Sequence, residues 1–249
     1  MSDLRTKDTL LGFWCATGHP AIIDAAASAG PDFVVIDTQH GVDLGRVDAS
    51  VFTVLAAYGV AGLVRVPSLD VTPIGRAFDL GADGIIVPLV ESAADAGRAV
   101  SATRHAPRGG RSYGMQTQRV GPFEKTAFVA IQVETAGAVD DLDAIAAVDG
   151  VDALYIGPAD LGLGLGGAPA PDVNEVFDGT HPNADTIGAA FEAVVNAAER
   201  HGIVPGLHVG DGATAARALE RGFRFCAVSA DIGLISSGLA RELRGARDS

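Results

Sequence analysis

Short, uninterrupted apolar runs recur along the chain, and Ala-rich amphipathic stretches separate them. A glycine and an acidic residue commonly introduce each run, and the glycine fits the C-terminal end of a preceding helix. Because the runs lack polar alternation, both faces of the strands they form should be covered, as in a parallel sheet. We expect about eight strands, near residues 10–16, 32–37, 61–66, 84–88, 128–134, 152–156, 203–208 and 223–229.

The amphipathic stretches predict helices between these strands, over residues 20–29, 45–57, 72–80, 92–103, 135–147, 185–201, 211–221 and 231–245. About eight strand–helix units in a chain of 249 residues predict an α/β protein with the TIM (β/α)8 barrel fold. No domain boundary is evident, so residues 1–249 should form a single barrel domain. A doubly wound open sheet is the alternative, but the G-x-G-x-x-G turn expected after its first strand is absent.

Composition narrows the range of partners. The net charge is −13, with 18 Lys and Arg against 31 Asp and Glu, which argues against nucleic acid or an anionic membrane as partner. Cys15 and Cys226 lie far apart in apolar runs, so we expect small buried side chains rather than a disulfide or a zinc site. No secretory signal and no apolar run of membrane length is evident, so a cytoplasmic location is expected.

Polar residues gather where the expected strands end. Barrel enzymes keep their sites at the C-terminal ends of the strands, and burying polar groups there without partners is costly. A convergence of such residues therefore indicates a functional site. The residues are Asp37, His40, Arg65, Gln132, Glu134 and Asp160.

Glu134 and Asp160 are hard oxygen ligands, too few to form a closed calcium cage. They suit Mg²⁺ or Mn²⁺, with Co²⁺ or Zn²⁺ as alternatives, if water and substrate oxygens complete the coordination. The other interpretation is a pair of carboxylates that cap helices. Both interpretations remain open at this point.

Arg65 could bind a carboxylate or a developing enolate oxygen, and a salt bridge inside the barrel is compatible with that role. His40 is the best candidate for acid–base chemistry among the six histidines. The others are expected to be solvated or to have partners, and the support for this is weakest for His208. The lysines, Lys7 and Lys125, both precede expected strands, at the wrong end of the barrel for a Schiff-base aldolase.

Six motifs, in this order, resemble the HpcH/HpaI aldolase family of class II, metal-dependent pyruvate aldolases, such as 4-hydroxy-2-oxoheptanedioate aldolase. They are DTQHG, LVRVP, FDLGADGIIVP, RGGRSYG, IQVET and YIGPADLG. The resemblance covers nearly the whole chain, and the QxET and GPADL motifs together are specific. It implies a TIM barrel, commonly assembled as a hexamer with an exchanged C-terminal helix.

The resemblance also implies roles for individual residues. Glu134 and Asp160 would hold the metal. Gln132, Asp160 and the backbone N–H of Ala159 would contact the oxo-acid. His40 would be the base, and Arg65 would stabilise the enolate.

The family also implies that Asp79 raises the basicity of His40. Asp79 ends an expected helix, however, at the opposite end of the barrel from His40. Either a neighbouring subunit supplies Asp79, or Asp37 takes this role within the chain. Many family members have Glu at the position of Gln39, and the connection over residues 161–184 also departs from the usual pattern, so substrate preference does not transfer directly.

The sequence thus predicts a metal-dependent aldolase that joins or cleaves a 2-oxo acid (pyruvate or hydroxypyruvate) and an aldehyde through a metal-stabilised enolate. A CoA-thioester lyase of the citrate-lyase-β type is one alternative. It would need a basic groove, for which Arg104, Arg108, Arg111 and Arg119 are the candidates. A non-catalytic barrel that serves as a scaffold is the other alternative.

Overall fold

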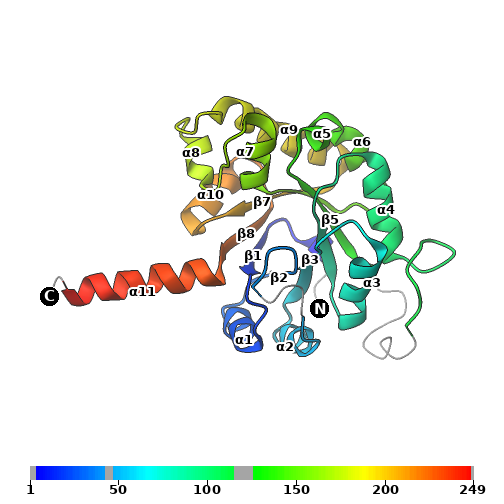
Figure 1. Cartoon of the computed structure of the whole chain (residues 1–249), viewed down its shortest axis with the longest axis horizontal. Helices are drawn as coiled ribbons and strands as arrows, with labels where there is room; N and C mark the ends of the chain where they lie inside the picture. The colour runs from blue at the N-terminus through cyan, green and yellow to red at the C-terminus, as the bar shows by residue number, and fades with distance from the viewer. Residues whose placement is uncertain (1–3, 43–46, 115–125, 248–249) are drawn as a thin grey trace.

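The computed structural model describes residues 4–42, 47–114 and 126–247. Eight parallel strands close into a barrel in the order in which they occur in the chain, with helices outside (Figure 1). The predicted TIM barrel is therefore confirmed. Its strands are β1 (Leu10–Cys15), β2 (Phe33–Asp37), β3 (Ala61–Arg65), β4 (Gly84–Val87), β5 (Phe128–Val133), β6 (Ala153–Ile156), β7 (Val204–Val209) and β8 (Phe225–Ala230).

Helices alternate with the strands. They are α1 (Pro20–Ser28), α2 (Ser50–Tyr58), α3 (Val71–Leu80), α4 (Ala93–Thr103), α5 (Ala136–Asp140), α6 (Leu142–Ala146), α7 (Pro158–Gly166), α8 (Val173–Phe177), α9 (Ala184–His201), α10 (Gly212–Glu220) and α11 (Asp231–Arg247), after a short 3-10 helix η1 (Leu4–Thr6). The long connection after β6 is thus partly helical. Its apolar positions Leu161, Val173 and Val176 are buried, which explains why α7 and α8 form there.

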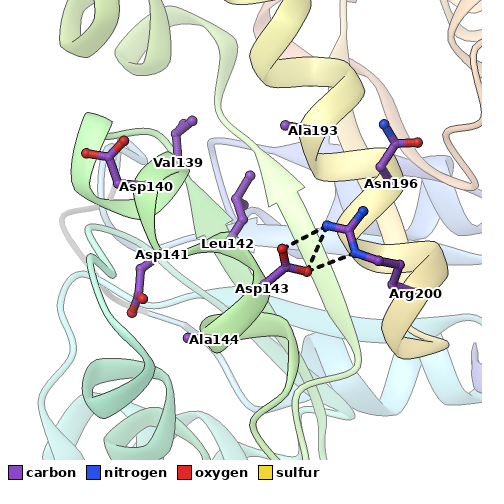
Figure 2. A pocket seen from close by; sticks show the side chains of 9 residues that line it. All are labelled: Val139, Asp140, Asp141, Leu142, Asp143, Ala144, Ala193, Asn196 and Arg200. Carbon is purple, nitrogen blue, oxygen red and sulfur yellow. Dashed lines mark hydrogen bonds and ion pairs between the residues drawn. The ribbon is translucent and has the colours of Figure 1, made fainter.

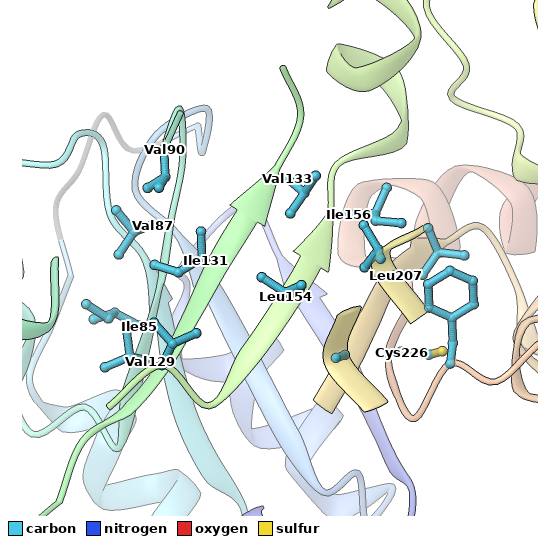
Figure 3. Packing of buried hydrophobic residues seen from close by; sticks show 14 of the residues in the cluster. Ile85, Val87, Val90, Val129, Ile131, Val133, Leu154, Ile156, Leu207 and Cys226 are labelled. Atoms are coloured by element: carbon cyan, nitrogen blue, oxygen red, sulfur yellow. The ribbon is translucent and has the colours of Figure 1, made fainter. Parts of the chain in front are cut away.

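Successive side chains on each strand alternate between the barrel interior and the surrounding helices. On β7, Leu207 and Val209 belong to the apolar layer shared with the helices, whereas Val204 packs against the interior cluster. Figure 3 shows the outer layer on β4 to β7, where Ile85, Val129 and Leu154 are among the packed side chains. Both strand faces are covered, which explains why the strands are apolar without a polar alternation.

Phenylalanines fill the lower part of the barrel interior, which is the part near the N-terminal ends of the strands. The ring centroid of Phe225 lies 4.5 Å from that of Phe33 and 5.5 Å from that of Phe128. Glycines on neighbouring strands provide the space for these rings. A Cβ at Gly12 would lie 2.3 Å from the Phe33 ring, and a Cβ at Gly84 would lie 2.7 Å from the Cβ of Phe128.

The N-terminal segment closes the end of the barrel at which the strands begin. Arg5 donates to the carboxylate of Asp152 at 2.6 and 2.8 Å, and its guanidinium lies 5.8 Å from the Phe128 ring centroid. Lys7 forms an ion pair with Asp32, which immediately precedes β2. Lys7 therefore lies at the end of the barrel that the sequence indicated, whereas Lys125 is outside the described residues.

α11 leaves the barrel and projects away from it (Figure 1). Its first residue, Asp231, is buried and accepts hydrogen bonds from the backbone N–H groups of Ala16 and Thr17, both at 2.9 Å. Beyond this anchor the helix exposes large apolar side chains, which are Ile232, Leu234, Ile235, Leu239 and Leu243. Among the described residues, no helix has the length and apolar character needed to span a membrane.

Candidate active site

The upper part of the barrel interior, near the C-terminal ends of the strands, is polar. The same alternation that turns the phenylalanines inward also turns inward residues at or next to the C-terminal ends of several strands. Hydrogen bonds and ring contacts join the side chains on β1, β2, β3 and β7, and the side chain on β5 donates to Glu134. They are Trp14 of β1, Asp37 of β2, Arg65 of β3, Gln132 of β5 and His208 of β7.

Arg65 is held rigidly in this layer. Its Nε and one terminal nitrogen donate to the two carboxylate oxygens of Asp37 at 2.9 and 2.5 Å, a bidentate arrangement between buried side chains. Its guanidinium carbon also lies 4.8 Å from the Trp14 ring centroid, within the range of a cation–π interaction. The neighbouring register of Asp37 and Arg65 on β2 and β3 makes the pair possible.

The ion pair keeps both charges in the barrel. Burial alone would raise the pKa of Asp37, but the hydrogen bonds and the positive charge of Arg65 outweigh it, so the pKa lies below its ordinary value. The backbone N–H groups of Gln39 and His40 also donate to Asp37, at 3.0 and 3.2 Å. Asp37 therefore stays ionised and orients Arg65.

Glu134 follows β5 and is buried. One carboxylate oxygen accepts the backbone N–H of Leu89 at 2.8 Å, and the other accepts the side-chain amide of Gln132. Leu89 adopts a left-handed backbone conformation with φ of 55°, which a residue other than glycine rarely adopts. The loop after β4 thus holds a strained backbone that contributes a donor to Glu134.

The charge of Glu134 lacks a direct cationic partner among the described residues. Burial raises its pKa most, the nearby negative charge of Asp160 raises it further, and the hydrogen bond from Leu89 only partly opposes this. Two carboxylates thus face one region of the barrel mouth with like charges. A bound cation would offset both the cost of burying the charged Glu134 and its repulsion with Asp160.

Asp160 lies in the first turn of α7, with its side chain exposed. The N-terminal cap of this helix is Gly157, and no side chain caps it. Thr135 provides the cap of α5 through its own side chain, so Glu134 is not a capping residue either. Neither carboxylate therefore satisfies a helix end, in contrast to the capping interpretation.

The donor set fits a divalent cation with few protein ligands. No group of three or more His, Cys, Asp or Glu side chains suited to a metal occurs in the described part of the chain. Glu134 and Asp160 would be the anionic ligands, and the side-chain oxygen of Gln132 is buried with no hydrogen-bond partner there. A Cβ at Gly157 would lie 2.6 Å from Gln132 Nε2 and 3.0 Å from Glu134 Oε2, so the glycine keeps this space open.

His40 lies in the loop after β2 and is exposed. Neither of the acids expected to support it contacts its ring among the described residues. Asp37 binds Arg65, and Asp79 near the end of α3 accepts a hydrogen bond from Arg111 at 2.8 Å. The side-chain oxygen of the neighbouring Gln39 is buried, with no hydrogen-bond partner in the described segments. Support for His40 by an acid thus remains a prediction.

His208 is not among the residues that the sequence led us to expect in the site. It is on the inner face of β7, and its ring meets the ring of Trp14 edge-on, with centroids 5.1 Å apart. Trp14 was also not expected there. The spacing of Val204, Gly206 and His208 at alternate positions could have identified its inward orientation.

A surface cavity lies outside the barrel, away from this site. It has a volume of about 500 Å³ and lies between α5, α6 and α9, where Asp143 accepts several hydrogen bonds from Arg200 (Figure 2). Its lining residues are outside the barrel, and Asp143 and Arg200 already neutralise each other. The chemistry-bearing residues are those at the mouth of the barrel.

The chain matches a known protein family over most of its length. The family model described as HpcH/HpaI aldolase/citrate lyase matches residues 10–237. The chain belongs to this family. The match includes β1 to β8 and every residue described above at the barrel mouth.

Individual members of the HpcH/HpaI family are similar over nearly their full length. The hydroxypyruvate/pyruvate aldolase of Paraburkholderia phytofirmans is 33% identical over 93% of this chain and 90% of its own. The 4-hydroxy-2-oxovalerate aldolase of Novosphingobium aromaticivorans is 36% identical over 98% of this chain and 93% of its own. A crystal structure of a family protein from Burkholderia cenocepacia has a TM-score of 0.84 and 32% identity, and the match covers 98% of this chain and 97% of that one.

Proposed function

We propose that the protein is a divalent-metal-dependent aldolase that joins or cleaves a 2-oxo acid and an aldehyde. The observation that carries this proposal is the meeting of an oriented, ion-paired Arg65 with two carboxylates that cap no helix, Glu134 and Asp160. The names of the similar aldolases, which include pyruvate and hydroxypyruvate, support the same reaction class. We infer that residues 1–249 act as one barrel domain.

The binding roles follow from the donors that each residue has available. Glu134 and Asp160 would hold the cation, which when bound would supply positive charge for the carboxylate and 2-oxo oxygens of the substrate. Gln132 would orient the oxo-acid. Ala159 is the second residue of α7, where a backbone N–H has no acceptor within the helix, so it can donate to the substrate carboxylate. Either Mg²⁺ or Mn²⁺ suits these ligands best.

Arg65 would stabilise the enolate oxygen. Its orientation is fixed by Asp37 and Trp14 before any substrate binds, so little reorganisation accompanies the reaction. His40 would move a proton on the aldehyde side, at the hydroxyl that the aldehyde oxygen becomes. Its exposure at the rim supports this position over one beside the enolate.

A CoA-thioester lyase is the less favoured activity. Of the arginines that could have formed a groove for CoA phosphates, Arg104 binds Asp149 and Arg111 binds Asp79. Arg119 lies outside the described residues. A purely structural role is disfavoured because it would not explain a desolvated carboxylate placed near a second acid.

The surface of α11 bears on the assembly of the protein. The exposed apolar side chains of α11 support its packing against another copy of the chain, as in the exchanged helix that the family resemblance implies. A hexamer and a cytoplasmic location remain predictions. A monomeric mass by light scattering would exclude the exchanged helix.

Proton exchange at carbon 3 tests the function without any aldehyde. The enzyme, incubated with pyruvate in D₂O, should introduce deuterium into the methyl group, and chelation of divalent ions should stop this. Arg65→Ala should reduce exchange by about 10²–10³-fold because it removes a preorganised donor to the oxyanion. His40→Ala should retain exchange and lose aldol cleavage. Exchange that survives EDTA, or trapping of the substrate by borohydride, would exclude the metal-dependent mechanism.

A further inference from the structure

His208 has an environment that the proposed roles leave unexplained. It occupies the inner face of β7 near its C-terminal end, and its side chain is half-buried. Its ring forms no hydrogen bond with any residue of the described chain, although it is held edge-on against Trp14 at 5.1 Å. A fixed polar ring with free nitrogens at the mouth of the barrel is available to a ligand.

Trp14 places His208 beside the proposed reaction centre. One ring system contacts both the Arg65 guanidinium, at 4.8 Å, and the His208 imidazole. Tyr155 stacks on the same indole with centroids 6.0 Å apart and planes 13° apart, which fixes the orientation of Trp14 from below. Gly206, two residues before His208, leaves room for this, since a Cβ there would lie 2.7 Å from the Tyr155 ring.

The imidazole of His208 is uncharged near neutral pH. Burial, and then the positive charge of Arg65, lowers its pKa to about 4. A neutral imidazole has one N–H donor and one acceptor nitrogen. It suits a hydroxyl group, which donates and accepts in the same way, better than a carboxylate, which only accepts.

We propose that His208 hydrogen-bonds a hydroxyl on carbon 3 of the 2-oxo acid and thereby favours hydroxypyruvate over pyruvate. This inference rests on the proposed function, in which Arg65 faces the oxygen on carbon 2. Carbon 3 is the next atom, and His208 contacts the same Trp14 ring as the Arg65 guanidinium. The exposed rim at His40 is left for the aldehyde.

Binding can be measured at the site itself because Trp14 is the single tryptophan in the chain. Its fluorescence, recorded in the presence of Mg²⁺, should give dissociation constants for hydroxypyruvate and for pyruvate. His208→Leu keeps a similar volume and removes both hydrogen-bonding atoms. His208→Asn keeps a donor and an acceptor, and His201→Leu is a matched control on the exposed end of α9.

We expect wild-type protein to bind hydroxypyruvate more tightly than pyruvate. His208→Leu should weaken hydroxypyruvate binding about tenfold, as for one lost hydrogen bond, and change pyruvate binding less than about threefold. His208→Asn should fall between wild type and His208→Leu, and His201→Leu should match wild type. A preference that is absent in wild type or unchanged in His208→Leu overturns the inference, as does equal weakening of both ligands.

The deuterium exchange experiment separates the two levels of the proposal. Metal-dependent exchange into pyruvate by wild-type protein, together with an unchanged preference in His208→Leu, would leave the aldolase function intact and remove only the role of His208. Wild-type protein that neither exchanges nor binds either oxo-acid would overturn the aldolase function and, with it, the role of His208.

Discussion

The barrel interior has two layers built by the same eight strands, and they differ in almost every physical property. The lower layer consists of packed apolar rings, among them Phe33, Phe128 and Phe225, all fully or nearly fully buried. The upper layer contains Arg65 and Glu134, which are also buried but charged. The strands thus provide stability at one end and chemistry at the other.

The two layers also differ in how completely their members are satisfied. The lower rings of Phe33, Phe128 and Phe225 have no polar atoms and pack against one another. In the upper layer Arg65 and Asp37 form an ion pair. The charge of Glu134 is only partly offset by Arg65 and by its hydrogen bonds, and Gln132 keeps a buried oxygen without a partner in the described chain. The Glu134 carboxylate and the Gln132 oxygen are groups that would meet a ligand, so the incompleteness of this layer supports the barrel mouth as the site.

Truncation in the lower layer should have the largest effect, and it should act on stability. Phe33→Ala removes a fully buried ring that packs against Phe225, and we expect the free energy of unfolding to fall by about 3–5 kcal/mol. Urea denaturation followed by circular dichroism measures this. Turnover per folded molecule should stay within about threefold of wild type. A large loss of turnover with unchanged stability would contradict the separation of the layers.

Removal of one upper-layer charge should act on activity instead. Glu134→Gln and Asp160→Asn keep side-chain size but weaken cation binding, so we expect turnover to fall by at least about a hundredfold. Asp143→Asn, which removes a carboxylate from the outer surface cavity, is the matched control. Circular dichroism should show an unchanged fold in all three. Normal turnover and metal dependence in both site variants would show that these acids do not hold a cation.

Much of the contrast between the layers was predictable. Apolar runs bounded by glycine located all eight strands to within two residues, because burial on both faces leaves a strong signal. Arg65, Glu134 and Asp160 were predicted because a charged residue that ends an apolar run is conspicuous. α7 and α8 were not predicted, since the Gly- and Pro-rich composition of that connection is typical of a loop.

Partners in space were harder to predict than positions. The ion pair of Asp37 with Arg65 depends on the register of β2 against β3, which the sequence does not specify. His208 was set aside because a lone histidine in a strand gives no sign of what faces it. Its significance comes from Trp14, which is nearly two hundred residues away in sequence and next to it in the closed barrel.

The smallest expected effect is on the pH dependence of stability, to which the two buried carboxylates of the upper layer contribute in opposite directions. The pKa of Glu134 is raised above its ordinary value of 4.5. Between pH 4.5 and the raised pKa, the folded protein therefore keeps a proton that the unfolded chain has released. Glu134 therefore contributes most to stability below that value, and the contribution is lost as pH rises through the folded pKa. Asp37 is the opposite case, because its pKa is lowered in the folded protein. Its contribution to stability is present above pH 3.8 and is lost as the pH falls below that value toward the folded pKa.

Chelator-treated Glu134→Gln should consequently be more stable than chelator-treated wild type near pH 7, by about 1.4 kcal/mol for each unit by which the pKa is raised. The difference should shrink as pH falls toward 4.5. The new amide can still accept the Leu89 N–H, and Gln132 can rotate its amide to accept from it, so few contacts are lost. Asp37→Asn should be less stable than wild type at pH 7, with a difference that shrinks at acidic pH. Urea denaturation between about pH 2 and pH 8 measures both trends, because the contribution of Asp37 is lost only below 3.8. A difference for Glu134→Gln that does not vary with pH would show that its carboxylate is not destabilised in the folded protein.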